Sequence, residues 1–160
     1  MKNSEIKVAL ITGGTKGIGF GIAEALLEEG IHVAITGRNK SKVSEAAEKL
    51  NSSVTTKVKA IGLMGDVTDF KSIQKAVDDT IKQFGQLDIV VANAGLGHFA
   101  PIEDLTIDQC QETIDTNLTG SFYTIQATIA ALKTSRGYFI TISRLAGTNF
   151  FSNGSAYHAS

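Results

Sequence analysis

The chain has 160 residues, a formal net charge of −1 and a single cysteine, Cys110. This length fits one domain with a sizeable core, so we expect residues 1–160 to form a single domain. The balanced charge argues against nucleic acid or an anionic membrane surface as a partner. No apolar run approaches the roughly 20 residues that a membrane helix needs, so no membrane association is expected. A lone cysteine fits a reducing compartment, and we therefore expect a cytoplasmic protein.

Short apolar runs recur along the chain and predict buried strands. They are mostly β-branched and continuously apolar, as strands covered on both faces are. The predicted strands are 7–12, 31–36, 58–64, 87–92 and 137–143.

Segments with helical periodicity separate these runs. The predicted helices are 17–29, 39–50, 68–84 and 106–133. Asn39, Thr68 or Asp69, and Thr106 are suited to cap the later three at their N-termini. Strand and helix in alternation predict an α/β fold: a Rossmann-type doubly wound parallel sheet in three layers. In such sheets ligands bind at the carboxyl ends of the strands.

A glycine-rich loop, TGGTKGIG at 12–19, joins the first strand to the first helix. Glycines allow positive φ and close approach to a pyrophosphate, and the helix N-terminus favours an anion. The spacing is Gly-x3-Gly-x-Gly, which is neither the usual dinucleotide fingerprint nor a P-loop. The residues expected at a dinucleotide here are Gly13, Thr15, Lys16, Gly17, Ile18 and Gly19.

This glycine loop resembles that of the short-chain dehydrogenase/reductases, and further motifs of that family follow it in order. They are Asp66-Val67 after the third strand, Asn93-Ala94-Gly95 after the fourth, Asn117 in the long helix and Tyr157 near the end of the chain. The resemblance covers 7–160. Each motif residue also has a purely structural interpretation, such as Asp66 as a capping acid or Asn117 as a helix residue bonded to its own backbone.

The resemblance implies an oxidoreductase that transfers a hydride between a nicotinamide cofactor and a small carbonyl or alcohol substrate. Asp66, Val67, Asn93, Ala94 and Gly95 would then contact the cofactor. A tyrosine, here Tyr157, would be the general acid/base, with Asn117 in support and a serine holding the substrate oxygen. The family also implies a homodimer or homotetramer. The sequence leaves the substrate open.

The end of the second strand bears on the choice of cofactor. An NAD site usually carries an acid there, whereas this strand is followed by Arg38. Arg38 is suited to bind a 2′-phosphate, and Lys16 adds a second cation. We therefore expect NADP(H) in preference to NAD(H), although both residues also fit ordinary solvated charges.

Two departures from the family pattern concern the catalytic residues. The family's lysine would follow Ser160, so we expect these residues to be the N-terminal portion of a longer chain that carries the C-terminal elements. Counted back from Tyr157, the family's serine position is Arg144, with Ser143 beside it. Neighbours on a strand point to opposite faces, so Ser143 replaces that serine only if the strand end slips or bulges.

Several interpretations of Arg144 stay open. It can bind the substrate oxygen, assist the tyrosine by its charge, block the site, or reflect an error or an engineered change. A non-catalytic NADP(H)-binding module, acting as a sensor or interaction protein, is the main alternative function, and a plain scaffold is another. Because His and Cys are not clustered, no metal site is expected.

Overall fold

A parallel sheet forms the centre of the computed structural model, which describes residues 6–55 and 57–160. The sheet has five strands in the order β3-β2-β1-β4-β5, and every neighbouring pair is parallel. The strands are Val8–Ile11 (β1), His32–Gly37 (β2), Ala60–Met64 (β3), Ile89–Ala92 (β4) and Tyr138–Thr141 (β5). The predicted Rossmann-type sheet is therefore confirmed.

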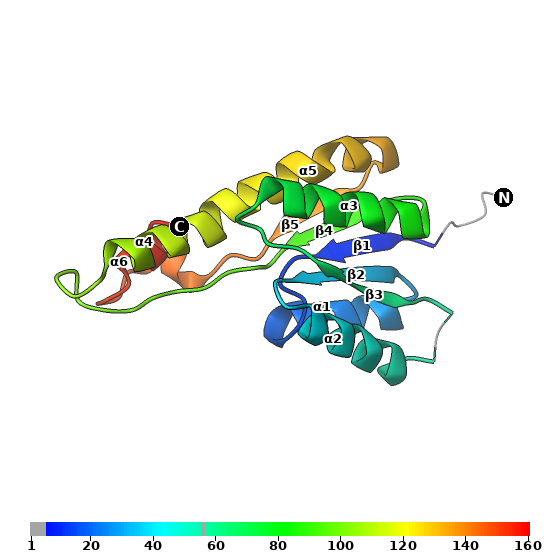
Figure 1. Cartoon of the computed structure of the whole chain (residues 1–160), viewed down its shortest axis with the longest axis horizontal. Helices are drawn as coiled ribbons and strands as arrows, with labels where there is room; N and C mark the ends of the chain where they lie inside the picture. Colours follow the sequence, from blue (N-terminus) through cyan, green and yellow to red (C-terminus); the bar gives the residue numbers. More distant parts are fainter. Residues whose placement is uncertain (1–5, 56) are drawn as a thin grey trace.

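Helices cover both faces of this sheet, which gives three layers (Figure 1). Helices α1 (Gly17–Glu28) and α2 (Lys40–Ser53) lie on one face, and α3 (Phe70–Phe84) and α5 (Gly120–Ser135) lie on the other. The remaining elements are α4 (Ile107–Ile114), the π-helical η1 (Asp115–Thr119), the 3₁₀ turn η2 (Leu145–Gly147) and α6 (Ser155–His158). Figure 1 shows α4 and α6 together beyond the carboxyl end of the sheet.

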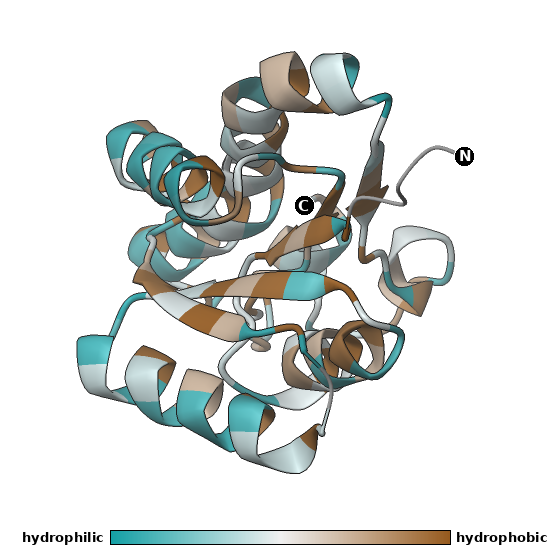
Figure 2. Cartoon of the chain, turned by 90° about the vertical axis from the view of Figure 1, so that its right-hand side faces the viewer, coloured by the Kyte–Doolittle hydropathy of each residue, from teal (hydrophilic) through white to brown (hydrophobic). Residues whose placement is uncertain are grey.

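Alternating side chains of the central strands supply two separate cores. Ile11 and Ile35 pack with Leu27 of α1 and Leu50 of α2, whereas Leu10 packs on the α3 and α5 side. All of these side chains are fully buried. Figure 2 shows the same division, with apolar residues along the strands and hydrophilic ones on the outward helix faces. Burial on both faces explains why the strands read as continuous apolar runs.

The strand order reverses beside β1. The chain builds outward from β1 through β2 to β3, and it then crosses back to place β4 on the other side of β1. The loops that follow β1 and β4 therefore diverge at the carboxyl edge of the sheet. Such a switch point is where open α/β sheets bind ligands.

Side-chain caps begin three of the helices, as the sequence predicts. Asn39 accepts a hydrogen bond from the Lys42 backbone N–H at 3.1 Å, and Thr106 forms a capping box with Gln109. Asp69, not Thr68, caps α3. No side chain caps α1, whose N-terminus follows the glycine loop.

The predicted long helix is one continuous helical segment with an irregular middle. The wider turn η1 separates α4 from α5, and periodicity alone does not reveal it because the apolar pattern continues on both sides. The strand expected at 137–143 ends earlier, at Thr141. Within the described residues, no helix is long and apolar enough to cross a membrane.

His32 lies at the amino-terminal end of the sheet, far from the switch point. Its Nδ1 accepts a hydrogen bond from the Lys59 backbone N–H at 3.0 Å, and its ring stacks on Phe84 at 4.6 Å. Burial lowers the pKa of His32 below its ordinary value. These contacts give this histidine a structural role.

The contact between β3 and α2 can be tested through Gly62. A Cβ at Gly62 would lie 2.5 Å from the carbonyl oxygen of Val43, whereas a Cβ at Gly21 in α1 meets nothing within 4 Å. We expect Gly62→Ala to lower the free energy of unfolding by about 1–3 kcal/mol, because backbone must shift. The matched Gly21→Ala should raise it by up to about 1 kcal/mol. Urea denaturation measures both, and equal stabilities would contradict the close packing.

Candidate cofactor and active site

A cavity of about 410 Å³ lies at the carboxyl edge of the sheet, where the loops after β1, β2, β3 and β4 converge. This volume falls within the range of small-molecule sites. Of the predicted cofactor residues, the cavity is lined by Gly13, Thr15, Lys16, Gly17, Ile18, Arg38, Asp66, Val67, Asn93, Ala94 and Gly95. Segments far apart in the chain therefore meet where the strand order predicts.

Gly19 is the predicted cofactor residue that does not line this cavity. It is buried below the loop, where a Cβ would lie 2.5 Å from Asn93 Nδ2 and 2.8 Å from the Gly13 carbonyl oxygen. Gly13 itself has a φ of 65° and would place a Cβ 2.9 Å from Ala94 Cα. These glycines allow the loop, α1 and the end of β4 to pack closely.

Hydrogen bonds between Thr12 and the segment after β4 hold the glycine loop in place. The buried Thr12 hydroxyl accepts from the backbone N–H groups of Asn93 at 3.0 Å and Ala94 at 3.1 Å. In return, Asn93 Nδ2 donates to the carbonyl oxygens of Thr12 at 2.9 Å and Gly13 at 3.2 Å. The Asn93 amide nitrogen is thus committed to the loop. Thr12 was not among the predicted site residues.

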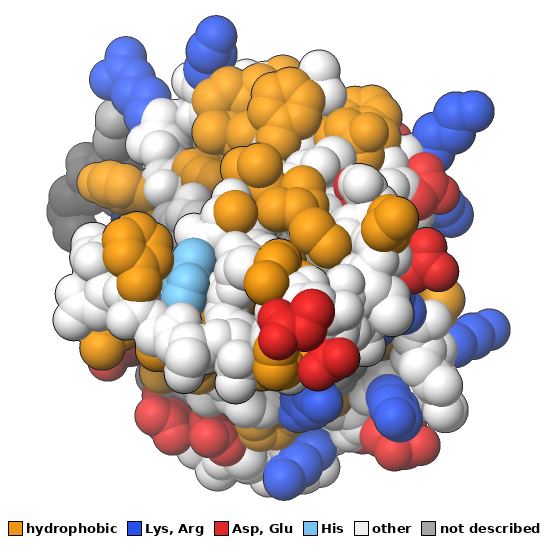
Figure 3. All heavy atoms as spheres, turned by 90° about the vertical axis from the view of Figure 1, so that its left-hand side faces the viewer, with side chains coloured by type: hydrophobic (Ala, Val, Ile, Leu, Met, Phe, Trp, Pro, Cys, Tyr) orange, Lys and Arg blue, Asp and Glu red, His pale blue; other side chains and the backbone are white. Residues whose placement is uncertain are grey.

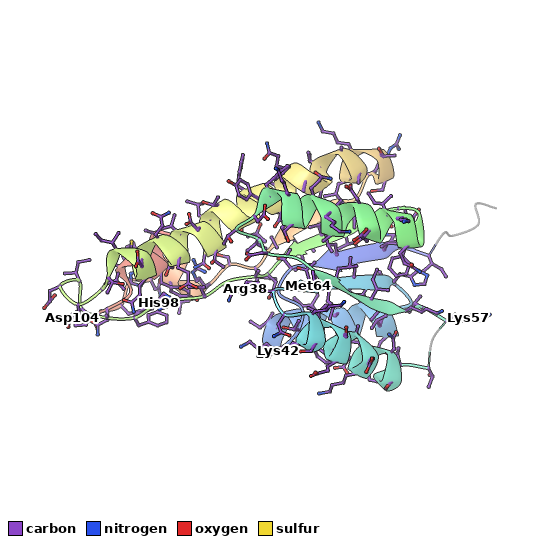
Figure 4. The ribbon with its side chains drawn as sticks, viewed as in Figure 1. Arg38, Lys42, Lys57, Met64, His98 and Asp104 are labelled. Atoms are coloured by element: carbon purple, nitrogen blue, oxygen red, sulfur yellow. The ribbon has the colours of Figure 1, made fainter. Side chains whose placement is uncertain are left out.

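Positive groups border the cavity at the start of α1 and the end of β2. The first turn of α1 has neither a side-chain cap nor an acidic residue, so its N–H groups and helix dipole face the cavity uncompensated. Lys16 and Arg38 are exposed and make no ion pair with any described residue. Figure 4 shows Arg38 at the carboxyl end of the sheet, with Lys57 at the opposite end.

Asp66 combines a structural role with its place in the cavity wall. Its Oδ1 accepts hydrogen bonds from the backbone N–H of Thr68 at 3.0 Å and the Thr68 hydroxyl at 2.8 Å. Asp66 therefore orders the turn before α3, whereas the helix cap itself is Asp69. The neighbouring Val67 is buried against Gly120, where a Cβ would lie 2.7 Å from Val67 Cγ2.

The π-helical turn η1 presents Thr116 and Asn117 to the site. Asn117 Oδ1 accepts from the Leu96 backbone N–H at 2.9 Å, and its Nδ2 donates to the Leu96 carbonyl at 2.8 Å and to Ser160 Oγ at 2.9 Å. Asn117 therefore joins the loop after β4 to the end of α6. The buried Thr116 hydroxyl lines the cofactor cavity and has no hydrogen-bond partner among the described residues.

A second cavity, of about 310 Å³, adjoins the first and contains Tyr157, Ser143 and Arg144. The two share Ile18 and Asn93 in their walls. Ser143 and Arg144 are both among the residues that line this cavity. Strand β5 ends at Thr141, so both residues lie in the extended segment that follows it.

The side chain of Arg144 packs directly on Tyr157. Its guanidinium carbon lies 3.9 Å from the centre of the tyrosine ring, and its Nη2 donates to the carbonyl oxygen and hydroxyl of Ser160, each at 2.6 Å. The Phe99 ring also contacts the Tyr157 ring, edge-to-face, with the two ring centroids 5.1 Å apart. Tyr157 is therefore held between a cation and an aromatic ring.

Sequence reasoning did not identify Leu96, Phe99 or Thr116 as parts of these cavities. Leu96 and Phe99 follow the predicted Asn-Ala-Gly turn closely, and that proximity is a usable signal. No sequence signal identifies Thr116, because its position in the cavity wall depends on the π-helical turn η1. His98, a residue near the same turn, instead pairs with Glu112 at 2.8 Å, on the loop that Figure 4 shows extending away from the sheet. The described residues contain no group of three metal-ligating side chains.

The strand order, the glycine loop and the cavity at the switch point define a Rossmann-type α/β domain. The family profile of the short chain dehydrogenases matches residues 7–160, and the chain belongs to that family. It is 36% identical over 156 residues to trans-4-hydroxycyclohexanecarboxylate dehydrogenase of Sinomonas cyclohexanicum, covering 96% of this chain and 60% of the relative.

Comparison with solved structures also places the chain among dehydrogenases of this fold. An alcohol dehydrogenase from the archaeon Thermococcus sibiricus, complexed with 5-hydroxy-NADP, has a TM-score of 0.90 and 32% identity, covering 97% of this chain and 65% of that chain. An NAD⁺-bound xylitol dehydrogenase has a TM-score of 0.89 and 30% identity, covering 96% of this chain and 58% of that one. The chain thus spans about 60% of the length of these relatives.

The role of Thr12 can be tested by removing its hydroxyl without changing its shape. We expect Thr12→Val to lower the free energy of unfolding by about 1–3 kcal/mol, because the N–H groups of Asn93 and Ala94 lose their acceptor. Thr12→Ser keeps the hydroxyl and should be markedly milder. Chemical denaturation of both variants measures the difference. A valine variant as stable as the serine variant would contradict this role.

Proposed function

We propose that this chain belongs to an NADP(H)-dependent oxidoreductase that transfers a hydride between the nicotinamide and a carbonyl or alcohol substrate. The observation that carries the proposal is that two neighbouring cavities share Ile18 and Asn93 in their walls. One is formed by the uncapped start of α1 and the glycine loop, and the other contains Tyr157. The Sinomonas relative, whose name describes dehydrogenation of a hydroxy compound, supports the substrate class.

The first cavity suits a dinucleotide on several independent grounds. The uncapped N-terminus of α1 offers free N–H groups to a pyrophosphate. A Cβ at Gly17 would meet no atom of the chain within 4 Å, so the open side of the loop is free for a ligand. The unpartnered Thr116 hydroxyl supplies a further hydrogen-bonding group. These residues would hold the diphosphate and the adjoining sugar.

Arg38 and Lys16 support NADP(H) as the preferred cofactor. Both line the cavity beside the end of β2, where no acid is present. A 2′-phosphate carries negative charge that a guanidinium binds through paired N–H groups, whereas a bare ribose hydroxyl gains little from it. The solved relatives include one complex with an NADP derivative and one with NAD⁺, so the side chains of this chain are the better guide.

The cofactor preference is tested with Arg38→Ala. We expect the variant to bind NADPH about 10- to 100-fold more weakly, because charge-assisted hydrogen bonds are worth about 1.5–3 kcal/mol. Its affinity for NADH should change less than about threefold, by the same scale. Lys57→Ala, at the opposite end of the sheet, is the control. Fluorescence titration measures each constant, and equal losses for NADPH and NADH would contradict the assignment.

The second cavity supports acid/base chemistry at Tyr157. In reduction, the Tyr157 hydroxyl would give its proton to the substrate oxygen as the carbonyl becomes an alcohol, and in oxidation the phenolate would remove the alcohol proton. The bound nicotinamide would supply or accept the hydride. Ser143, exposed in the same wall, would hydrogen-bond the substrate oxygen. Asn117 would act as a positioning residue through Leu96 and Ser160.

The catalytic assignment is tested with Tyr157→Phe on a panel of ketones and alcohols. We expect kcat to fall at least about 100-fold, the usual contribution of a positioned acid or base, with NADPH affinity retained. Tyr138→Phe, on the exposed face of β5, is the matched control and should keep its activity. Saturable NADPH binding by the unaltered chain without turnover of any substrate would instead favour the non-catalytic module.

A further inference from the structure

We infer that Arg144 selects substrates that carry a carboxylate close to the reacting carbon, namely short keto acids and the corresponding hydroxy acids. The inference rests on the proposed function, because it takes Tyr157 as the group that exchanges a proton with the substrate. It goes further by naming the chemical class of the substrate and the residue that recognises it.

The first argument is the charge of the cavity. Arg144 is the single charged residue among the described residues that line the second cavity, and the same holds for a smaller adjoining cavity near Asn117. No described carboxylate side chain forms an ion pair with it. A partly buried cation without a counter-ion is costly, and a substrate carboxylate would supply the missing charge.

The second argument is the number of free donors on the guanidinium. Arginine has five N–H groups, and only Nη2 donates to the chain, to the two oxygen atoms of Ser160. Nη1 and Nε make no hydrogen bond with the described residues. Stacking on Tyr157 and the bonds to Ser160 also fix the plane of the group. A preorganised guanidinium with free N–H groups is suited to an anion.

The third argument is distance. The guanidinium carbon lies 3.9 Å from the centre of the Tyr157 ring. A carboxylate bound to the guanidinium would therefore lie in the same cavity as Tyr157, close to a substrate carbon whose oxygen contacts the tyrosine. This closeness favours acids whose carboxylate lies a few bonds from the carbonyl, of which 2-oxo and 3-oxo acids are the simplest.

The other residues that line the second cavity indicate which substituent such a substrate carries. Ile18, Leu96, Phe99 and Ile142 give the wall an apolar side. Seen from the end of the molecule that carries α4 and α6, hydrophobic side chains gather in the upper and central part of the view, with acidic and basic ones below them and around the edge (Figure 3). These walls fit an aliphatic or aromatic substituent on the keto acid.

The test compares each acid with its neutral methyl ester. We would assay 4-methyl-2-oxopentanoate, acetoacetate and their esters with NADPH, using the unaltered chain, Arg144→Gln and Arg144→Lys. We expect kcat/KM of the unaltered chain to be about 10- to 100-fold higher for acid than for ester, as for one charge-assisted interaction. Arg144→Gln should bring the acid-to-ester ratio of kcat/KM close to one, whereas an effect through Tyr157 alone would lower both substrates and leave the ratio unchanged. Arg136→Gln, at the end of α5, is the control.

Two outcomes would overturn the inference. The first is an equal kcat/KM for acid and ester in the unaltered chain. The second is an Arg144→Gln variant whose kcat/KM falls by the same factor for acid and ester, which would mean that Arg144 only supports Tyr157. Absence of turnover with every acid and ester would count against the proposed function instead. In that case a binding measurement tests the role of Arg144 independently of turnover. In calorimetric titrations with NADP⁺ present, 4-methylpentanoate should bind at least about tenfold tighter than 4-methylpentanamide, and only in chains that keep Arg144. Equal affinities would refute the inference.

Discussion

The hydrogen bonds between Thr12 and the Asn93–Ala94 segment are the constraint on which the rest of the site depends. The strand order reverses beside β1, so the loops leaving β1 and β4 run apart at the sheet edge. Their backbone groups need partners there, because they cannot pair with a further strand. Thr12 and Asn93 supply these partners reciprocally, and the glycine loop is held where α1 begins.

The walls of the two cavities differ in the share of backbone and side-chain atoms. The first is made largely of backbone, from the glycine loop and the ends of four strands, so its shape follows from the sheet. The second depends on side chains that come from distant parts of the chain. Tyr157 from α6 and Arg144 from the segment after β5 meet there only because Asn117 and Ser160 join α6 to the π turn. Changes to such a site require few substitutions, whereas changes to the first would disturb the fold.

Positive charge is placed at both ends of this combined cavity although the whole chain is nearly neutral. Arg38 and Lys16 lie at the nucleotide end, and Arg144 lies beside the proposed acid/base. Each group suits a different anion, a sugar phosphate at one end and a carboxylate at the other. Leu96 lines both cavities and Phe99 lines the second, so apolar side chains accompany the cations there.

The sequence by itself determined the order of strands and helices and the position of the glycine loop. These features depend on local periodicity, capping residues such as Asn39 and Thr106, and the burial of strands on both faces. Helix and strand ends were predicted less accurately, as at β5, where pairing with β4 ends before the apolar run does.

Tertiary structure alone decided the parts of the site that depend on contacts between distant segments. The π turn that presents Thr116 and Asn117 leaves no mark in the apolar pattern. Ser143 and Arg144 line one cavity in the segment after Thr141, where the paired part of β5 ends earlier than the apolar run indicates. The family spacing implied that Arg144 lies near Tyr157, but the stacking of its guanidinium on the ring is visible only in the folded chain. Local sequence encodes elements and their caps, whereas the meeting of side chains is set by how those elements pack.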